Sequence, residues 1–257
     1  MTTKKINEKR NKKILVVISV ALFAILLLHF YFRDEKVYTL KEYSPDGKIT
    51  DISEYIIRNG DTIFEGKFTR YNKKGIKIAE GQFIDNEPNG ICSYYYDNGN
   101  LESFHYRENS KITLESTFYD TTGLINKYVM YTDSGKSCFI ISYDEKGVRE
   151  YSGYPLLEVY QNNIKTKQML RVGDTLKYQY LLANLPNTKR SFKVKNVSID
   201  DSDIKRIIKH RPPTKVNVEE VLIKKGINKI SAIVEYKFED KITPVFKDTI
   251  TFEVNVN

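Results

Sequence analysis

A tyrosine followed four residues later by a glycine recurs through the first half of this chain, and it restricts the fold more than any other feature. The regular copies are separated by 24, 24, 12 and 12 residues. Such spacing suits strands of about seven residues joined by tight turns, in which Asn, Asp and Gly tolerate left-handed backbone. The sequence therefore predicts a long antiparallel meander. The regular copies are Tyr71–Gly75, Tyr95–Gly99, Tyr119–Gly123, Tyr131–Gly135 and Tyr143–Gly147, and an earlier copy, Tyr43–Gly47, is out of phase.

Two stretches carry this motif most clearly. They read Glu65-Gly66-x-Phe68-x-x-Tyr71-x-x-x-Gly75, continued by Glu80-Gly81-x-Phe83, and Tyr94-Tyr95-Tyr96-x-Asn98-Gly99-x-Leu101. These residues resemble the MORN-repeat-variant family over about residues 41–153, and bacterial members of that family are often labelled antitoxin-like. The resemblance implies an elongated sheet of two-stranded units with a scaffolding or binding role, and it offers no catalytic residues. The segment 107–111 departs from the pattern because it has no turn glycine.

Residues 14–32 form an uninterrupted apolar block, ILVVISVALFAILLLHFYF, without charge, Pro or Gly. A helix of that length spans ~28 Å, close to the ~30 Å of a bilayer core. No cleavage site or nearby Cys follows, so we expect an uncleaved transmembrane signal anchor. Because residues 1–13 carry a net charge of +5, the positive-inside rule predicts that this tail is cytoplasmic. Residues 33–40 are then a linker, and everything after residue 32 is periplasmic or extracellular.

The chain contains 19 Tyr and no Trp, with many Lys, Asn and Ile. This composition indicates an AT-rich coding bias and so favours a bacterial source. Together with the apolar block, it predicts a single-pass protein of the bacterial inner (cytoplasmic) membrane.

A second module is expected over residues 155–257, where the repeat has stopped. Six segments there have strand character and are separated by turn signals, which predicts a β-sandwich. The final hairpin from Gly226 looks like that of an immunoglobulin-like domain, although no Cys–Trp–Cys core is present. Residues 200–209 are expected to form a short helix, because Ile204, Ile207 and Ile208 share one helical side. The expected strands are Leu156–Tyr160, Thr175–Leu182, Ser191–Ile199, Val216–Ile223, Lys229–Phe238 and Val245–Val256. The predicted fold class is thus mainly β.

Aromatic side chains are expected on both faces of the repeat sheet, since neighbours along a strand alternate. One interpretation is that cross-strand rings stabilise a thin sheet, at ~0.2–1 kcal/mol per pair. The other is a stacking platform for a glycan or a partner peptide. The candidate binding residues are Tyr94, Tyr96, Phe104 and Tyr106.

The formal net charge of +8 is unevenly distributed, with −4 over residues 14–154 and +7 over residues 155–257. Outside the tail, basic residues are dense only near residue 209. They would stabilise the negative end of the expected helix, or they would bind anionic lipid or a polyanionic envelope polymer. Nucleic acid is not an expected partner for a domain outside the cytoplasm. The candidate anion-binding residues are Lys205, Arg206, Lys209, Arg211 and Lys215.

Cys92 and Cys138 are 46 residues apart, or about four strands of the meander. At ~4.8 Å per strand they would lie ~19 Å apart, whereas a disulfide needs Cα atoms within ~7 Å. We therefore predict two free thiols.

No nucleophile-elbow, zinc-protease, P-loop or dinucleotide-binding motif occurs, and the three His lie in separate segments. We expect no catalytic, metal-binding or cofactor-binding residues and no small-molecule cofactor. The predicted function is a non-catalytic, membrane-anchored extracytoplasmic binding or scaffold protein of the bacterial cell envelope, with an envelope protein or polymer as its partner. Two alternatives stay open, namely an antitoxin-like or immunity protein that neutralises a toxin, and an envelope glycan hydrolase.

Overall fold

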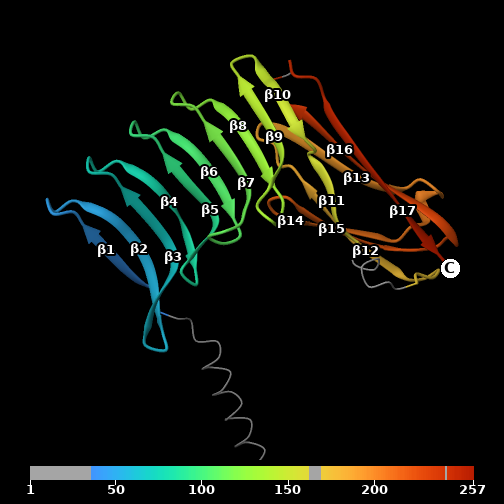
Figure 1. The fold of residues 1–257 in the computed structure, drawn as a ribbon, viewed down its shortest axis with the longest axis horizontal. Helices are drawn as coiled ribbons and strands as arrows, with labels where there is room; N and C mark the ends of the chain where they lie inside the picture. Colours follow the sequence, from blue (N-terminus) through green and yellow to red (C-terminus); the bar gives the residue numbers. More distant parts are fainter. Residues whose placement is uncertain (1–35, 162–168, 241) are drawn as a thin grey trace, which may run out of the picture.

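The computed structural model describes residues 36–161, 169–240 and 242–257. These residues are almost entirely β-structure in antiparallel sheets, which confirms the mainly-β prediction (Figure 1). The predicted tail, anchor and first part of the linker lie outside the described residues. In the described ranges, no helix has the length and apolar character needed to cross a membrane.

The first module is a sheet of ten strands in which each strand pairs with its neighbours in the sequence. This is the long antiparallel meander predicted from the tyrosine–glycine repeat. Its strands are β1 (Tyr38–Tyr43), β2 (Ile49–Arg58), β3 (Asp61–Tyr71), β4 (Lys77–Ile84), β5 (Glu87–Tyr95), β6 (Leu101–Arg107), β7 (Thr113–Tyr119), β8 (Ile125–Tyr131), β9 (Ser137–Asp144) and β10 (Gly147–Gly153).

The repeated glycines close hairpins of this sheet, all at one end of the strands except Gly135, which closes β8–β9 at the other end. In the turn after β3, the Asn72 N–H bonds the Ile76 carbonyl and the Gly75 N–H bonds back to the Asn72 carbonyl, both at 2.9 Å. Gly75 has φ +80°, a conformation that glycine adopts without steric cost. The turns at Gly47, Gly99, Gly123 and Gly135 repeat this pair of hydrogen bonds and the positive φ.

Four of the nine turns depart from that geometry, among them those after β6 and β9. After β6, where no glycine is present, the Asn109 side chain accepts the N–H groups of Lys111 and Ile112, each at 2.9 Å. Between β9 and β10, Asp144 pairs directly with Gly147, so this copy of the motif makes a tighter turn. The repeated tyrosine also marks a break in strand register. Register shifts fall immediately before Tyr43, Tyr71, Tyr95, Tyr119 and Tyr131.

The C-terminal module consists of two smaller antiparallel sheets. One has the order β11-β12-β15-β14 and the other the order β13-β16-β17. All six expected strands are present, with ends that differ by a few residues. Their bounds are β11 (Leu156–Gln161), β12 (Thr175–Leu182), β13 (Thr188–Asn196), β14 (Arg206–Arg211), β15 (Lys215–Val221), β16 (Gly226–Phe238) and β17 (Phe246–Val256).

The helix expected over residues 200–209 is wrong. Only a single 3-10 turn forms, at Asp201–Asp203, and the following residues become strand β14. The physical reason is pairing with β15, which aligns Ile208 with Val218 in an unbroken register. Pairing with the next strand of the hairpin outweighs the local helical spacing of three isoleucines.

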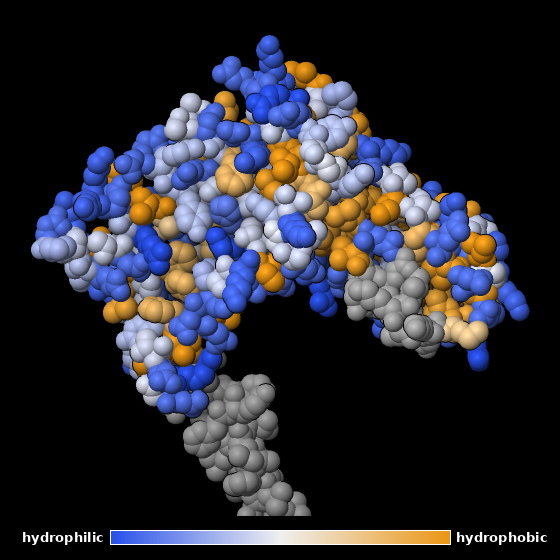
Figure 2. Space-filling model, in the orientation of Figure 1, coloured by the Kyte–Doolittle hydropathy of each residue, from blue (hydrophilic) through white to orange (hydrophobic). Residues whose placement is uncertain are grey.

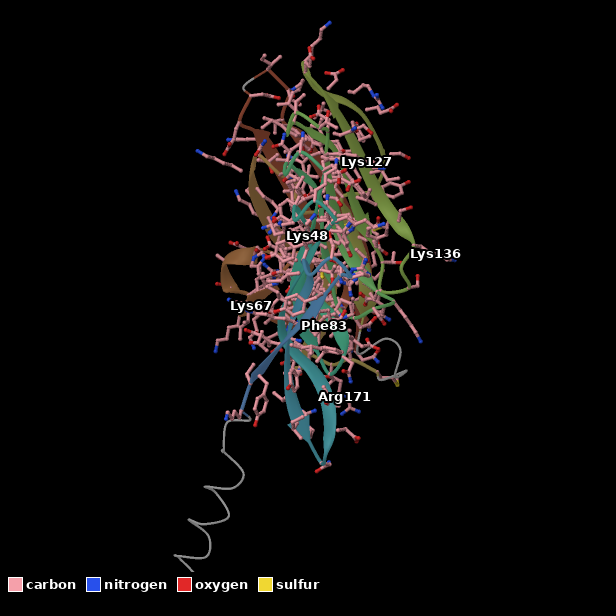
Figure 3. The ribbon with its side chains drawn as sticks, turned by 90° about the vertical axis from the view of Figure 1, so that its left-hand side faces the viewer. Lys48, Lys67, Phe83, Lys127, Lys136 and Arg171 are labelled. Carbon is pink, nitrogen blue, oxygen red and sulfur yellow. The ribbon has the colours of Figure 1, made fainter. Side chains whose placement is uncertain are left out.

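The two modules share one hydrophobic core. Side chains from β8 and β9 with no exposed surface, such as Tyr128, Met130 and Phe139, belong to the same buried cluster as Tyr178 and Tyr236 of the C-terminal module. The repeat sheet therefore has a module-side face and an outer face, visible edge-on in Figure 3, where Lys67 and Lys127 project to opposite sides. The module-side face carries Phe104, Tyr106, Glu115, Thr117, Tyr128, Met130, Phe139 and Ile141, and the outer face carries His105, Ser116, Phe118, Lys127, Val129 and Ile140.

The repeat sheet extends past the module at its β1 end. The space-filling view shows a concave margin between these first strands and the C-terminal module (Figure 2). A small buried cluster of Phe68, Ala79 and Cys92 stabilises this part on the outer face, with Phe83 and Tyr94 packed against it. Cys92 and Cys138 lie on β5 and β9 and are both free thiols, as predicted.

Candidate functional site

The four aromatic candidates divide between the two faces of the repeat sheet. Phe104 and Tyr106 lie on the module-side face of β6. Tyr94 lies on the outer face, where its ring meets His105 edge-on at a centroid distance of 5.4 Å. Tyr96 follows β5, and its hydroxyl donates to the Tyr119 carbonyl at 2.8 Å. The structure therefore brings together only Phe104 and Tyr106.

The five basic candidates do not form one surface patch, because the Arg206 side chain is buried and bonded within the C-terminal module. Its guanidinium donates two hydrogen bonds to Asp201, at 2.8 and 2.9 Å, and one to Glu220 at 2.7 Å. It donates a further bond to the Val194 carbonyl, and its side chain is 9% exposed. Glu220 is itself buried and accepts a bond from the Tyr178 hydroxyl. Arg206 is thus a structural ion-pair partner and not an accessible anion ligand.

Lys215 connects the two modules. Its ammonium lies 3.0 Å from Asp133 and 3.6 Å from Glu108, which belong to loops of the repeat sheet. The other three basic candidates, Lys205, Lys209 and Arg211, are exposed and form no ion pair with any residue that the structure describes.

A junction cleft of about 430 Å³ opens where the β14–β15 hairpin meets the module-side face of the repeat sheet. Phe104 and Tyr106 line it from the sheet, and Arg211 and Lys215 line it from the hairpin. Members of the two predicted groups therefore meet in one place, with a volume typical of ligand-binding clefts. The remaining lining residues are Ile91, Glu115, Asn184, Arg190, His210, Pro212, Pro213, Thr214 and Val216.

Two buried polar groups line the junction cleft. Glu115 is 4% exposed and accepts a hydrogen bond from the Tyr128 hydroxyl at 3.0 Å. Burial raises the pKa of Glu115 to about 7, despite hydrogen bonds from Tyr128 and Asn184 and the nearby charge of Arg190. Thr214 is 1% exposed, and its hydroxyl has no hydrogen-bond partner among the described residues. An unpartnered buried hydroxyl carries a desolvation cost, which sets Thr214 apart from the other lining residues of the junction cleft.

A shallower depression continues from the junction cleft along the module-side face. It has a volume of about 590 Å³ and shares Ile91 and Tyr106 with the cleft. Its lining mixes apolar and polar side chains, the latter including Lys67, Glu80 and Gln82. The two hollows together form a groove that runs from β3 to the β14–β15 hairpin.

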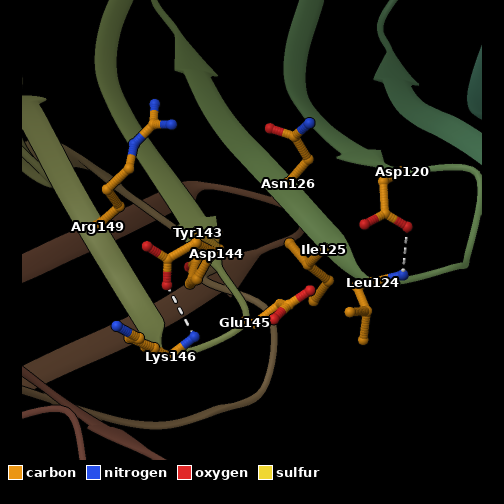
Figure 4. A pocket seen from close by; sticks show the side chains of 9 residues that line it. All are labelled: Asp120, Leu124, Ile125, Asn126, Tyr143, Asp144, Glu145, Lys146 and Arg149. Carbon is orange, nitrogen blue, oxygen red and sulfur yellow. Dashed lines mark hydrogen bonds between the residues drawn. The ribbon is translucent and has the colours of Figure 1, made fainter.

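Another cleft, of about 460 Å³, lies among the turns at the opposite ends of the strands (Figure 4). Two of its three carboxylates, those of Asp120 and Asp144, are occupied by their own turns. Asp120 accepts the N–H groups of Thr122 and Leu124, and Asp144 accepts that of Lys146. Burial, and then the charge of Asp240, raise the pKa of Tyr143 at the base of this cleft. These contacts explain Asp120 and Asp144 as parts of hairpins, and the Tyr143 hydroxyl, like that of Thr214, has no partner among the described residues. The junction cleft draws its lining from both modules, so it is the better candidate.

His105 is the one titratable ring held between hydroxyl groups among the residues that the structure describes. Its Nδ1 lies 2.6 Å from the Ser116 Oγ and its Nε2 lies 3.2 Å from the Ser103 Oγ. Burial, helped by the charge of Arg107, lowers the pKa of His105 to about 4, so the ring is neutral at pH 7. Its two ring nitrogens face serines and not a carboxylate, and both serines are buried, so this is a packing arrangement and not a catalytic triad. Within the described ranges, no three His, Cys, Asp or Glu are grouped closely enough to hold a metal ion.

Sequence reasoning missed Glu115 and Thr214. Glu115 stands within the otherwise uncharged strand β7, TLESTFY, and a lone carboxylate in such a strand is the signal that could have found it. Thr214 has no comparable signal, because its burial depends on how the hairpin is seated against the repeat sheet.

No protein-family model and no curated protein matches this chain. Among solved structures, one match is a crystal structure of accessory secretory protein 1, 2 and 3 in Streptococcus pneumoniae. The sequences are 15% identical, the TM-score is 0.22, and the match covers 48% of this chain and 20% of that one. The chain thus spans a fifth of the length of that neighbour. A similarity of this size carries no argument about fold or function.

Proposed function

We propose that this chain is a non-catalytic binding protein of the bacterial cell envelope, anchored in the inner membrane by residues 14–32 and active outside the cytoplasm. In this proposal the first module is a MORN-like repeat sheet and the second is an immunoglobulin-like domain. The strand orders β11-β12-β15-β14 and β13-β16-β17 support the second assignment, because constant-type immunoglobulin domains use this arrangement of seven strands.

The junction cleft is the observation that carries the proposal. It combines an aromatic surface, an exposed guanidinium and two buried polar groups, and no single local segment supplies all of these. Rings that offer their faces and edges, with a cation at the rim, suit an elongated partner that is at least partly anionic. The lining contains one carboxyl group, Glu115, whereas glycoside hydrolysis typically uses two. This difference favours binding over turnover.

The test is site-specific photo-crosslinking in cells that express the full membrane-anchored chain. Tyr106 in the cleft is replaced by p-benzoylphenylalanine, and Tyr43, which is 59% exposed on the distant strand β1, is replaced in the same way as a matched control. We expect one dominant adduct from position 106, none of the same mass from position 43, and loss of the adduct when Arg211→Ser is added. Equal adducts at both positions, or none at position 106, would overturn the proposal.

The same experiment separates the alternatives. A toxin captured at position 106 would favour the antitoxin-like role. For the hydrolase, the expected signature is turnover of envelope glycan by the full chain that Glu115→Gln abolishes.

A further inference from the structure

The C-terminal module has a strand edge whose backbone groups are available for pairing. Strand β14 lies at the end of its sheet and pairs only with β15. The Val221 N–H bonds the Lys205 carbonyl, so Lys205 and the alternate residues after it turn their backbone groups towards β15. The N–H and C=O groups of Arg206, Ile208 and His210 therefore point to the free edge. None of these groups has a backbone or side-chain partner among the described residues.

The neighbouring free edge, on β13, shows that an edge of this module can be closed by side chains. Val197 bonds to β16, so the backbone groups of Asn196 and Val194 point outward. The Asn196 N–H is bound by Asp201 and the Val194 carbonyl is bound by Arg206, each at 2.8 Å. The connection between β13 and β14 thus caps one edge and leaves the other open.

The side chains along β14 indicate what pairs with it. Ile207 is 53% exposed and Ile208 is 37% exposed, so the strand offers apolar contact on both faces. Lys205, Lys209 and Arg211 stand on the same face as Ile207, exposed and without an ion pair among the described residues. Lysine on an edge strand repels a strand of like charge and attracts an acidic one.

Charge also argues against two other strands that could pair with the β14 edge, namely a second copy of β14 and a segment of this same chain. In a symmetric antiparallel pair of two copies of β14, Arg211 of one copy would lie opposite Lys205 of the other. Of this chain's own segments outside the described residues, 1–35 has a net charge of +4 and 162–168 contains two Lys and no acidic residue. The edge therefore suits an acidic segment of a different protein.

We infer that the free edge of β14 binds an extended acidic segment of a partner protein as an added strand. The segment pairs its backbone with Arg206, Ile208 and His210, places acidic side chains beside Lys205, Lys209 and Arg211, and continues into the junction cleft that Arg211 lines. This inference rests on the proposed binding function and names the partner as a protein.

The test measures binding of labelled probe peptides to the full-length protein in detergent micelles by fluorescence anisotropy. The first probe alternates glutamate with valine over eight residues, and the second alternates lysine with valine. Polygalacturonate serves as an acidic glycan without a peptide backbone. Ile208→Pro removes the outward N–H without breaking a bond to β15, and proline is tolerated at such edge positions. Ile208→Val is the matched control that keeps the N–H.

We expect the glutamate–valine peptide to bind the wild-type protein and the Ile208→Val variant equally and the Ile208→Pro variant about tenfold more weakly. Binding should also slow amide exchange at Ile208 and His210. Because Ile208→Pro could disturb the strand, Lys209→Glu provides a second variant with an intact backbone. Lys209→Glu should weaken binding of the glutamate–valine peptide and allow the lysine–valine peptide to bind.

Three outcomes would overturn the inference. These are equal peptide binding by the proline and valine variants, no protection of the β14 amides, and binding of polygalacturonate that is stronger than peptide binding and insensitive to Ile208→Pro. An adduct at position 106 in cells that persists in the Ile208→Pro variant would leave the proposed function in place while removing strand addition. Absence of any adduct in the wild-type background would remove the proposed function itself.

Discussion

The two ends of the repeat sheet use the same hairpin motif but are stabilised in different ways. At the β8–β9 end, Tyr128, Met130 and Phe139 have no exposed surface because the C-terminal module covers them. At the other end every residue of β1 is exposed, and the only buried cluster there consists of Phe68, Ala79 and Cys92 among the described residues. The motif therefore determines strand and turn, whereas burial determines how firmly each hairpin is held.

The largest expected difference comes from removing one ring at each end. Phe139→Ala should lower the free energy of unfolding by about 3–5 kcal/mol, because the ring is fully buried and stacks on Phe246 across the junction. Phe68→Ala should cost less, since its cluster is small and lies near solvent. Urea unfolding followed by circular dichroism measures both. Equal losses would show that the module does not add to the stability of the sheet.

Glu115, on the module-side face of the repeat sheet, and His105, on its outer face, should make the free energy of unfolding change with pH in opposite directions. Glu115 has a folded-state pKa of about 7, above the unfolded value of 4.5, so its stabilising contribution is complete below pH 4.5 and is lost as pH rises towards 7. The loss is at most about 3 kcal/mol. His105 has a folded-state pKa of about 4, below 6.5, so its contribution is present above pH 6.5 and is lost as pH falls towards 4.

The two slopes oppose each other in the wild-type protein between about pH 4.5 and 6.5. Glu115→Gln should therefore reveal a protein that loses stability on acidification, and His105→Phe one that loses stability as pH rises to 7. Thermal melts across this range provide the measurement. Parallel slopes for the two variants would contradict the assignment.

A smaller effect is expected from filling the space at Gly81. A Cβ at this position would lie 2.9 Å from the Phe68 ring and 3.0 Å from the Cys92 sulfur. Gly81→Ala should therefore destabilise the β1 end by about 1–3 kcal/mol through overpacking. Combining it with Phe68→Leu should recover part of the loss, because the two changes share one contact. Additive losses in the double variant would mean that the ring is not the obstacle.

The smallest effect concerns the ion pairs of Lys215. Lys215→Met should cost about 0.5–1 kcal/mol at low salt and less at high salt, because both acidic partners are half exposed. Lys229→Met, which removes an exposed pair with Glu253 inside one sheet, is the matched control. If Lys215→Met and Lys229→Met lower the free energy of unfolding equally, the ion pairs of Lys215 between the modules contribute no more than an ordinary surface ion pair.

Local sequence patterns predict most of the strands and turns, but they predict few of the contacts that one segment makes with another. Strand β12 lies at its expected bounds, because alternation and flanking turns act over neighbouring residues. Ile207 and Ile208 continue a helical spacing from Ile204 but lie in strand β14, because the competing influence, pairing with β15, comes from a segment several residues further along the chain.

The site shows the same limit. Residue type alone identifies Phe104, Tyr106, Arg211 and Lys215 as candidates, yet their convergence depends on how the C-terminal module is seated. Arg206 carries the same charge as its neighbours in the sequence and differs only through its buried partners.

The shared turn geometry of the hairpins has a consequence for length. Each hairpin contributes two strands, or ~10 Å across the sheet, and its closing bonds involve only its own residues at Asn72–Ile76 and the equivalent turns. A unit of about 24 residues, or two strands with their turns, inserted near β3 would therefore lengthen the repeat sheet by one hairpin. The junction cleft, which lies towards the other end of the sheet, would keep its shape. The repeat sheet can thus serve as a spacer whose reach is set by the number of its hairpins.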